Sequence, residues 1–541
     1  MSTAAQTGHQ PMPAGIPYIV TNEFAERFCY YGINAILSVY MVNFLYFGEA
    51  QATTWQSLFK SAAYFFPVLG AIISDVFLGK YKTIMIFSSA YVAGCAILAL
   101  GGEALLPAGL FLVALGTGGI KPCVSTHVGD QFTSKNQGLI ERAFSWFYLA
   151  INAGSLISIF LCPILLPKYG PEVAFGLPAI MMAIAVWVFW LGRNTFQQLP
   201  PAGKEWFTDV FSGIGLPTIG RLLMIYLFVA FYWSLWEQSN GQTWVLQAQS
   251  ELMDKHLGFG IEVLPAQIQM VNALFILLMV PVFTYLIYPV AARFCQVTPL
   301  RKIGAGLFVC AGSFMVIAWI ESRIQAGIVT SVWWQILAYA VLTASEVMVS
   351  ITALEFSYKQ APLKMKAFIM SLFLLSTSLG NLFTAGVNSF MVRDLEATAM
   401  EAGAQTWVSI DTERDLVEGQ KIDLYGSNGL TLLTGEEPRP LTGTFLIAEI
   451  EPGNRVRLID PVRRDPVVTE GQFTPATAST QTYALVGPQY FMFFSWVMIA
   501  GALIFIVVAM FYKERTYVRE DEDGTASKEI DAEAQAEGAS A

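Results

Sequence analysis

Long apolar stretches recur along the chain and are separated by short polar segments. A membrane core about 30 Å thick needs roughly 20 apolar residues in a helix, and the sequence contains twelve such stretches. Their approximate spans are 18–45, 53–78, 81–101, 106–127, 142–167, 173–193, 219–245, 264–290, 299–322, 328–356, 364–391 and 487–512. The pattern predicts an all-α polytopic membrane protein with twelve transmembrane helices.

The polar segments divide this pattern into regions. Residues 17–193 are expected to form an N-terminal six-helix bundle, and residues 218–391 together with 487–515 a C-terminal one. The segment 194–217 is expected to be a cytoplasmic linker, either a short amphipathic helix on the membrane surface or a plain loop. The tail 516–541 is acidic and rich in alanine, which predicts disorder.

Residues 392–486 interrupt the apolar pattern between helices eleven and twelve. They carry 15 acidic and 8 basic residues, with alternating apolar positions and turn signals. The segments KIDLYGSNGLTLL and TFLIAEIEPGNRVRLI are both predicted to be β-hairpins, around GSNG and EPGN. By the predicted topology this small β-rich insert is extracytoplasmic. It is either a spacer without a function of its own or a sensor that reads a ligand.

Composition supports a membrane protein and excludes several other classes. Hydrophobic residues make up 55% of the chain and charged residues 13%, whereas a soluble domain carries about 25% charge. No basic stretch supports binding to nucleic acid. Loops on the side of the two termini carry 15 Lys and Arg residues, against 3 in the short loops on the other side. The positive-inside rule therefore places both termini in the cytoplasm of a multi-pass protein of the cell (inner) membrane.

The chain shows no pattern of an enzyme or a metal site. Its six cysteines lie in or beside apolar stretches without CxxC spacing, so we interpret them as small buried residues without a disulfide or metal role. HExxH, GxSxG and Cys–His arrangements are lacking, which argues against a membrane-embedded enzyme. We expect no cofactor and no metal.

Charged residues inside the predicted spans are candidate functional residues, because a charge at mid-bilayer costs about 2.5–3.5 kcal/mol on insertion scales. Helix one contains NEFAERFCYYG, in which Glu23, Glu26 and Arg27 share one helix face. Two carboxylates beside one guanidinium leave one acid that can take up a proton. The alternative is a buried ion pair that only fixes helix packing.

Three further charges lie in other spans. Lys121, in GTGGIKPCV, needs an anionic partner, either a carboxylate of the protein or one of a substrate; snorkelling to the cytoplasmic surface is the alternative. Glu237 lies among aromatic residues in FYWSLWEQSNGQTW, and Glu346 stands alone in LTASEVMVS. Four acids against two bases suit a cavity that binds protons and a cationic ligand group.

Isolated polar residues recur in other helices. Tyr64 lies in helix two, Asn152 in YLAINAGS and Asn272 in MVNALF. Each is either a binding residue or a partner in an interhelical hydrogen bond, which contributes about 0.6–2 kcal/mol.

Several motifs together resemble one transporter family. NEFAERFCYYG resembles the ExxER–FxYYG signature of the proton-dependent oligopeptide transporter (peptide transporter) family of the major facilitator superfamily. GAIISDVFLGKYKT, GTGGIKPCVSTHVGDQF, FSWFYLAINAGSLIS, YWSLWEQSNGQTW and EFSYKQAPLKMKAFIMSLFLLSTSLGN resemble its later signatures, in the same order. The resemblance covers roughly residues 17–390 and 487–515.

The resemblance implies two six-helix bundles with a substrate between them, and import of di- and tripeptides with protons by alternating access. We expect a monomer in the lipid bilayer. Lys121 would bind the peptide carboxylate and pair with Glu346 when the intracellular side closes. Glu346 and Asn272 would receive the peptide amino terminus, and Asn152 its backbone.

The remaining roles follow from the same resemblance. Proton coupling is implied for Glu23, Glu26, Arg27 and Glu237. Glu237 would also help to gate the outside, and Tyr30, Tyr31 and Tyr64 would line the pocket. The alternative is transport of another small solute by the same fold, such as nitrate or an amino-acid-like compound.

The sequence departs from the family pattern in four places. Many bacterial relatives carry an arginine on helix one that pairs with the helix-seven acid, whereas Asn34 stands here. Animal relatives carry a histidine on helix two where this chain has Ser57. The helix pair that some bacterial members have between the bundles is missing. The insert of animal members lies between helices nine and ten, whereas the insert of this chain, at 392–486, lies between helices eleven and twelve.

Overall fold

The computed structural model describes most of the chain. The described residues are 12–132, 139–198, 200–201, 203, 215–258, 260–361, 366–412, 416–425, 429–433, 438–474, 479–485, 487–513, 515–519 and 527–531. Most of the predicted linker helix therefore lies outside the described residues, as do the GSN of the predicted GSNG turn and most of the tail.

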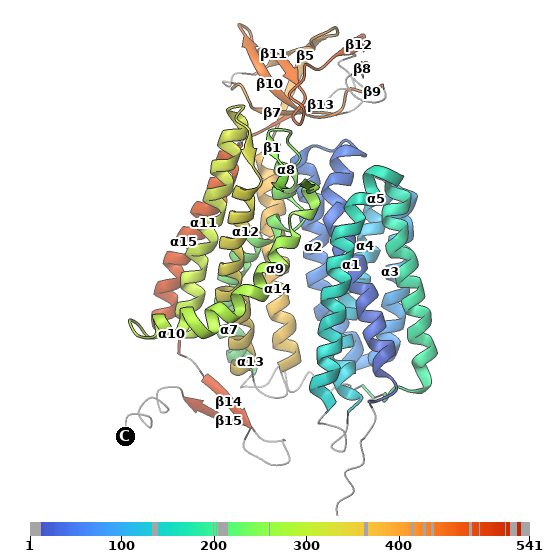
Figure 1. The fold of residues 1–541 in the computed structure, drawn as a ribbon, viewed down its shortest axis with the longest axis vertical. Coiled ribbons are helices and arrows are strands. Elements are labelled where there is room, and N and C mark those ends of the chain that lie inside the picture. Colours follow the sequence, from blue (N-terminus) through green and yellow to red (C-terminus); the bar gives the residue numbers. More distant parts are fainter. Residues whose placement is uncertain are drawn as a thin grey trace, which may run out of the picture.

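The first half of the chain forms a bundle of long helices. Their bounds are α1 Ile16–Asn43, α2 Glu49–Ile72 with the π-helix η1 Ile73–Leu78, α3 Lys80–Leu100, the 3-10 turn η2 Glu103–Leu105, α4 Leu106–Asp130, α5 Ile140–Leu191 and the 3-10 turn η4 Gly192–Asn194. Figure 1 shows them side by side as one unit. Their buried apolar residues form one continuous cluster, so this N-terminal bundle has its own hydrophobic core.

The long helix α5 consists of two arms. Gly170 has non-helical angles (φ 79°, ψ 175°) in the middle of its 52 residues. The chain doubles back there, because both arms reach the same part of α1. The thiol of Cys29 is 3.0 Å from the carbonyl oxygen of Pro178, while Cys162 packs against Gly32. Residues 16 apart on a straight helix would be about 24 Å apart. The predicted break between 167 and 173 is thus present as a kink.

The second half forms another bundle. Its elements are α7 Gly215–Ser239, α8 Thr243–Ala248, η5 Pro265–Gln267, α9 Met270–Val282, η6 Phe283–Ile287, α10 Tyr288–Ala291, α11 Pro299–Gln325, α12 Trp333–Glu346, η7 Val347–Ile351, α13 Thr352–Gln360, α14 Lys366–Met391 and α15 Pro488–Phe511. Short strands β1 Met253–Asp254, β2 His256–Gly258, β3 Ile261–Glu262 and β4 Thr330–Ser331 lie in its loops. A second continuous apolar cluster fills this C-terminal bundle.

Many of these helices are suited to a membrane. Among the described residues, ten helical segments are long and apolar enough to cross one. The two arms of α5 count there as one segment, and α1, which carries Glu23, Glu26 and Arg27, is not included. The chain is thus a helical multi-pass membrane protein, and the number twelve stays a prediction.

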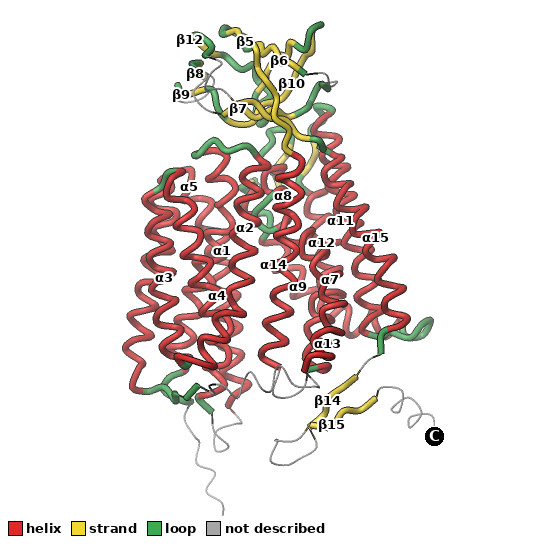
Figure 2. Tube along the Cα trace, turned by 180° about the vertical axis from the view of Figure 1, so that it is seen from behind, coloured by secondary structure: helices red, strands yellow, loops and turns green. Residues whose placement is uncertain are grey.

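Residues 392–483 contain a β-barrel that caps one end of the bundles (Figures 1 and 2). The strands follow the order β10-β11-β6-β5-β13-β7 and close on each other. Their bounds are β5 Val392–Glu401, β6 Trp407–Asp411, β7 Lys421–Tyr425, β10 Gly443–Glu451, β11 Arg455–Ile459 and β13 Ser479–Tyr483. A side sheet holds β8 Leu430–Leu432, β9 Arg439–Pro440 and β12 Thr469–Gly471. The barrel has its own apolar core.

One of the two predicted hairpins is wrong. β10 and β11 pair antiparallel across the EPGN turn, as the sequence predicts. β7, however, pairs with β10 and β13, and β8 pairs with β12 and β9. Both edges of β7 are therefore taken up by closure of the barrel, a non-local pairing that local turn signals do not reveal.

Two smaller expectations also differ from the structure. In the predicted disordered tail, β14 Arg515–Arg519 and β15 Ser527–Asp531 form an antiparallel pair. Five of the six cysteines are buried as expected, but Cys295 is exposed just beyond α10. It follows the last apolar residues of that helix and has no core to enter.

Candidate functional site

The charged motif of α1 forms a compact buried cluster. Arg27 Nε lies 3.0 Å from Glu23 Oε1, one helical turn away, and the Arg27 guanidinium also contacts Glu26. The hydroxyl of Thr117 in α4 donates to Glu26. All three charged residues are at most 5% exposed. They share one helix face, as the i, i+3 and i+4 spacing predicts, and two carboxylates meet one guanidinium.

Lys121 of α4 lies among tyrosines rather than carboxylates. Its Nζ is 4.0 Å from the ring centre of Tyr64 and 5.9 Å from that of Tyr30. In the described part of the chain no carboxylate oxygen lies within 4.0 Å of this ammonium, so Lys121 and Glu346 are not paired in this structure. The aromatic faces stabilise the cation and leave it able to accept an anionic ligand group.

Glu346, at the end of α12, is held by neutral donors. The indole Nε1 of Trp236 lies 2.9 Å and Nδ2 of Asn272 lies 2.8 Å from Glu346 Oε2. Asn272 Nδ2 also lies 3.0 Å from the hydroxyl of Thr343. Glu346 and Asn272 thus meet as expected. Trp236, which lies inside the quoted YWSLWEQ motif, was not recognised as their partner from the sequence.

Tyr31 connects these groups across the two bundles. It interacts electrostatically with Arg27 of its own bundle and with Glu237 and Glu346 of the other. Lys121 likewise interacts with Arg27 and Glu237. Tyr31 and Lys121 thus lie near charged groups of both bundles. Tyr30, buried beside Tyr31 with ring centres 5.5 Å apart, packs behind it.

Asn152 is the predicted site residue that the structure does not join to the others. Its Nδ2 donates to the backbone carbonyl of Tyr148, one turn earlier on α5, at 2.7 Å. This local bond satisfies the amide without a ligand.

The partner of Glu237 is Lys60, which the sequence analysis overlooked. Lys60 Nζ on α2 lies 2.8 Å from Glu237 Oε2 on α7, and both side chains are almost fully buried. The ammonium also donates to the backbone carbonyls of Glu237 and Asn240, at 2.9 and 2.5 Å. With Lys60 the candidate charged residues are three bases, Arg27, Lys60 and Lys121, and four acids. The signal was available, because Lys60 is itself a charge inside the predicted span 53–78.

The positions that depart from the family pattern surround this ion pair. Asn34, at the place of the missing arginine, donates from Nδ2 to Asn240. Ser57, at the place of the missing histidine, accepts from Gln242 at 3.2 Å. Ser38 donates to the carbonyl of Gly241 at 2.5 Å. We call this set of contacts between α1–α2 and residues 237–242 the insert-end gate, because it lies at the end of the bundles that faces the insert.

Gly241 allows the two sides of the insert-end gate to approach closely. It has φ +78°, and a Cβ there would lie 2.2 Å from the carbonyl oxygen of Asn34. Both the backbone angle and the contact therefore require glycine. The bundles are closed against each other at this end.

No metal site is evident in the described residues, since none of their His, Cys, Asp and Glu side chains form a suitable group of three.

A sequence model of the POT family matches residues 81–219 and 215–408 of this chain. The peptide transporter family 1 protein of Drosophila melanogaster is 37% identical over 363 residues, which are 58% of this chain and 48% of that protein. Human solute carrier family 15 member 2 is 36% identical over 365 residues, 58% of this chain and 49% of that protein. The chain thus spans about half the length of the curated relatives it matches.

Solved structures agree with this assignment. The crystal structure of the POT family transporter PepTSo superposes with a TM-score of 0.63 at 33% identity, covering 70% of this chain and 90% of that one.

Proposed function

This chain belongs to the POT family of secondary transporters, and from that premise we propose that it imports di- and tripeptides together with protons. The observation that carries the proposal is a cation in one bundle and an acid in the other: Lys121 on α4 has no described carboxylate within 4.0 Å, and Glu346 on α12 is held by neutral donors. A short peptide zwitterion has a carboxylate for the first and an ammonium for the second. A long peptide could not satisfy both ends at once, which accounts for a limit to two or three residues.

The proposed architecture is the major facilitator fold with twelve spans. The ten apolar segments, the second arm of α5 and the charged helix α1 supply them (10 + 1 + 1). The excess of Lys and Arg on the side of the termini supports a cytoplasmic location of that side and an extracytoplasmic location of the barrel. The protein would then reside in the cell membrane as a monomer.

The proposed peptide site uses the geometry of both bundles. Lys121, unpaired with any described carboxylate and resting on Tyr64, would take the peptide carboxylate. Glu346, fixed by Trp236 and Asn272, would take the amino terminus. Tyr30 and Tyr31 would line the region between them. Asn152 would reach a peptide backbone only after giving up its bond to its own helix.

Proton coupling is proposed for the α1 cluster and for Glu237. Protonation of Glu26 or Glu23 would weaken its hold on Arg27, and protonation of Glu237 would release Lys60. Release of Lys60 removes the charge attraction that closes the insert-end gate. An inward proton gradient then drives uptake, since one elementary charge crossing 100 mV contributes about 2.3 kcal/mol.

The test is uptake of labelled dialanine by proteoliposomes with an imposed proton gradient. The unmodified protein should accumulate dialanine, and Lys121→Ala should abolish accumulation while remaining folded. Lys168→Ala, which removes a lysine that stacks on Tyr169 away from the site, is the matched control and should transport normally. Full uptake by Lys121→Ala would overturn the assignment of Lys121.

The alternative solute is tested in the same vesicles. Labelled nitrate or a single amino acid replaces dialanine. Uptake of either one without uptake of dialanine would show that this solute, and not a peptide, is the transported substrate. The presence of residues for both ends of a zwitterion favours the peptide, because an inorganic anion has no use for Glu346.

A further inference from the structure

The β-barrel insert touches both bundles, but it is joined covalently to only one. Its first strand β5 continues directly from α14, and the chain leaves it into α15. Both helices belong to the C-terminal bundle. Any connection between the insert and the N-terminal bundle is therefore made by non-covalent contacts, which can break and re-form.

Additional contacts fix the insert to the C-terminal bundle. Arg464 donates to the carbonyl of Ile324, at the end of α11, at 2.8 Å. The backbone N–H of Glu251 donates to the carbonyl of Val462 at 3.1 Å. Together with the two chain connections, these bonds make the insert follow the C-terminal bundle when it moves.

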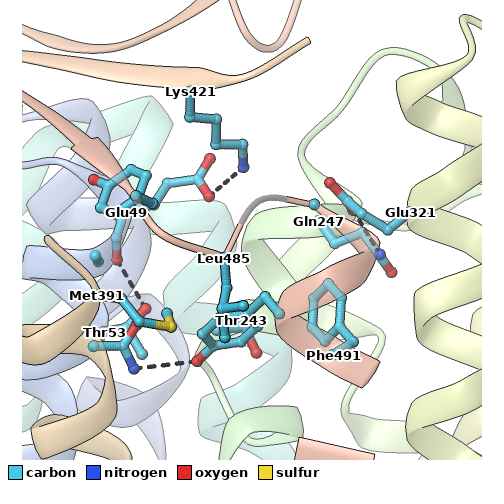
Figure 3. Close-up of a pocket in the computed structure, with 14 residues that line it drawn as sticks. Glu49, Thr53, Thr243, Gln247, Glu321, Met391, Lys421, Leu485 and Phe491 are labelled. Carbon is cyan, nitrogen blue, oxygen red and sulfur yellow. Dashed lines mark hydrogen bonds and ion pairs between the residues drawn. The ribbon is translucent and has the colours of Figure 1, made fainter. Parts of the chain in front are cut away.

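The contacts to the N-terminal bundle converge on the α1–α2 turn. Lys421 Nζ lies 2.5 Å from Glu49 Oε2, with the two side chains 24% and 26% exposed. The backbone N–H of Glu49 lies 3.2 Å from the hydroxyl of Thr444. The Arg439 guanidinium stacks 4.0 Å from the ring centre of Tyr46. Figure 3 shows Lys421 reaching from the insert strand to Glu49.

The Lys421–Glu49 pair lines a cavity at the junction of three parts of the molecule. Glu49 and Thr53 come from the N-terminal bundle, Gln247 and Glu321 from the C-terminal bundle, and Lys421 from the insert (Figure 3). The junction is thus loosely packed, and water reaches the Glu49–Lys421 pair. Separation of the bundles at this end would break that pair.

We propose that the insert is an intramolecular latch that holds the bundles closed at the insert end. The latch consists of the Lys421–Glu49, Thr444–Glu49 and Arg439–Tyr46 contacts, all of which must break when the N-terminal bundle moves away. It adds to the insert-end gate, which lies deeper between the bundles. The proposal rests on the alternating-access motion proposed above, and it gives the insert a role in setting the balance between the two states.

The test measures opening directly rather than transport. Spin labels are placed at Leu105→Cys and Val329→Cys, exposed positions in loops of the two bundles at the insert end, with Cys295 replaced by Ser. Double electron–electron resonance in nanodiscs gives the distance distribution. Lys421→Met should raise the ratio of open to closed molecules about fivefold, as expected for a partly exposed ion pair.

Two further variants make the result specific. Arg455→Met removes ion pairs to Glu401 and Glu451 that lie wholly within the barrel, and it should leave the distribution unchanged. Exchanging the charges (Lys421→Glu with Glu49→Lys) should restore the distribution of the unmodified protein. An unchanged distribution in Lys421→Met, or equal shifts in Lys421→Met and Arg455→Met, would overturn the latch. Failure of dialanine uptake would instead bear on the proposed substrate, since the distances are measured without it.

Discussion

Two buried ion pairs in this molecule differ in which parts they join. Arg27 binds Glu23 and Glu26 on its own helix, so rigid movement of one bundle against the other leaves this cluster intact. Lys60 binds Glu237 across the two bundles, so the same movement must break it. The two groups of charges thus differ in proposed role because of the parts of the molecule that they join, more than because of their chemistry. In the proposed mechanism the first cluster takes up a proton in either state, while the second holds one state closed.

The first prediction tests the role assigned to the cluster within α1. Glu26→Gln removes one of two carboxylates beside Arg27, so the guanidinium keeps Glu23 as its permanent partner and no acid of this cluster is left to titrate. We expect complete loss of gradient-driven dialanine accumulation, with exchange of dialanine across the membrane preserved. Counterflow in proteoliposomes without a gradient measures the exchange. Accumulation that survives in Glu26→Gln would place coupling elsewhere.

The second prediction tests the ion pair between the bundles. Glu237→Gln leaves the Lys60 ammonium buried without a counter-charge, and such a break typically costs about 3–5 kcal/mol. The cost falls on the closed state, so the ratio of closed to open molecules should fall about 100-fold or more. Distances between labels at positions 105 and 329 measure it.

The double variant Lys60→Met with Glu237→Gln is the control for this pair. It removes the uncompensated charge and should recover most of the closed population. Glu23→Gln, which changes the cluster within α1, should leave the distances unaltered. Equal opening in Glu23→Gln and Glu237→Gln would show that the distinction between the two pairs is wrong.

The third prediction tests how Glu346 is held, in comparison with the acids of α1. The acids of α1 are balanced by a guanidinium, whereas Glu346 is held by neutral donors. A hydrogen bond to a charged group contributes about 1.5–3 kcal/mol, so Asn272→Ala should raise KM for dialanine roughly tenfold or more. N-acetylated dialanine lacks the ammonium, so its inhibition constant for dialanine uptake should not change in this variant. An unaltered KM would remove Asn272 from the amino-terminal site.

The fourth prediction concerns the latch and pH. Asp423 of β7 is buried beside Gly48, and burial raises its pKa to about 6, with the nearby Glu49 adding to the rise and Thr444, Tyr425 and Lys421 opposing it. Tyr483 also contacts this carboxylate. Opening would expose Asp423 to water and separate it from Glu49, so its pKa would fall towards the ordinary value of about 3.9.

The direction of the pH effect on closure follows from the pKa values of Asp423 in the closed and open states. The closed state binds more protons than the open state between pH 4 and 6, so closure strengthens as the pH falls through that window. Below about pH 4 no further change is expected. Compared with Asp423→Asn at each pH from 7 to 4, the distances at positions 105 and 329 in the unmodified protein should shift towards the closed state, by at most tenfold per pH unit. Asp423→Asn should lose this dependence, and a dependence that persists in it would point to another group.

Local patterns in the sequence were sufficient for most helices and for part of the site. Apolar length identified most of the long helices, and the spacing of Glu23, Glu26 and Arg27 identified a shared face on which the structure shows them in contact. Glu346 and Asn272, 74 residues apart, were placed together only through the family resemblance. Their meeting depends on the packing of α9 against α12, which helix periodicity does not specify.

The failures share a physical origin in non-local contacts. β7 was assigned to its neighbour in sequence, but barrel closure supplies partners from β10 and β13. Glu237 was left without a partner because the expected cation was sought on α1, whereas α2 provides it. Lys60 is one turn before Tyr64 on the same helix, and only the approach of α7 to α2 shows which acid it meets.

Gly241 offers a way to hold this protein in its other state. An alanine methyl group there would occupy the space now taken by the Asn34 carbonyl, and the two sides could not come fully together. Gly241→Ala would therefore act as a permanent spacer, biasing the population towards molecules whose interior faces the barrel side. Such a variant would make that conformation accessible to structure determination without a bound inhibitor or antibody.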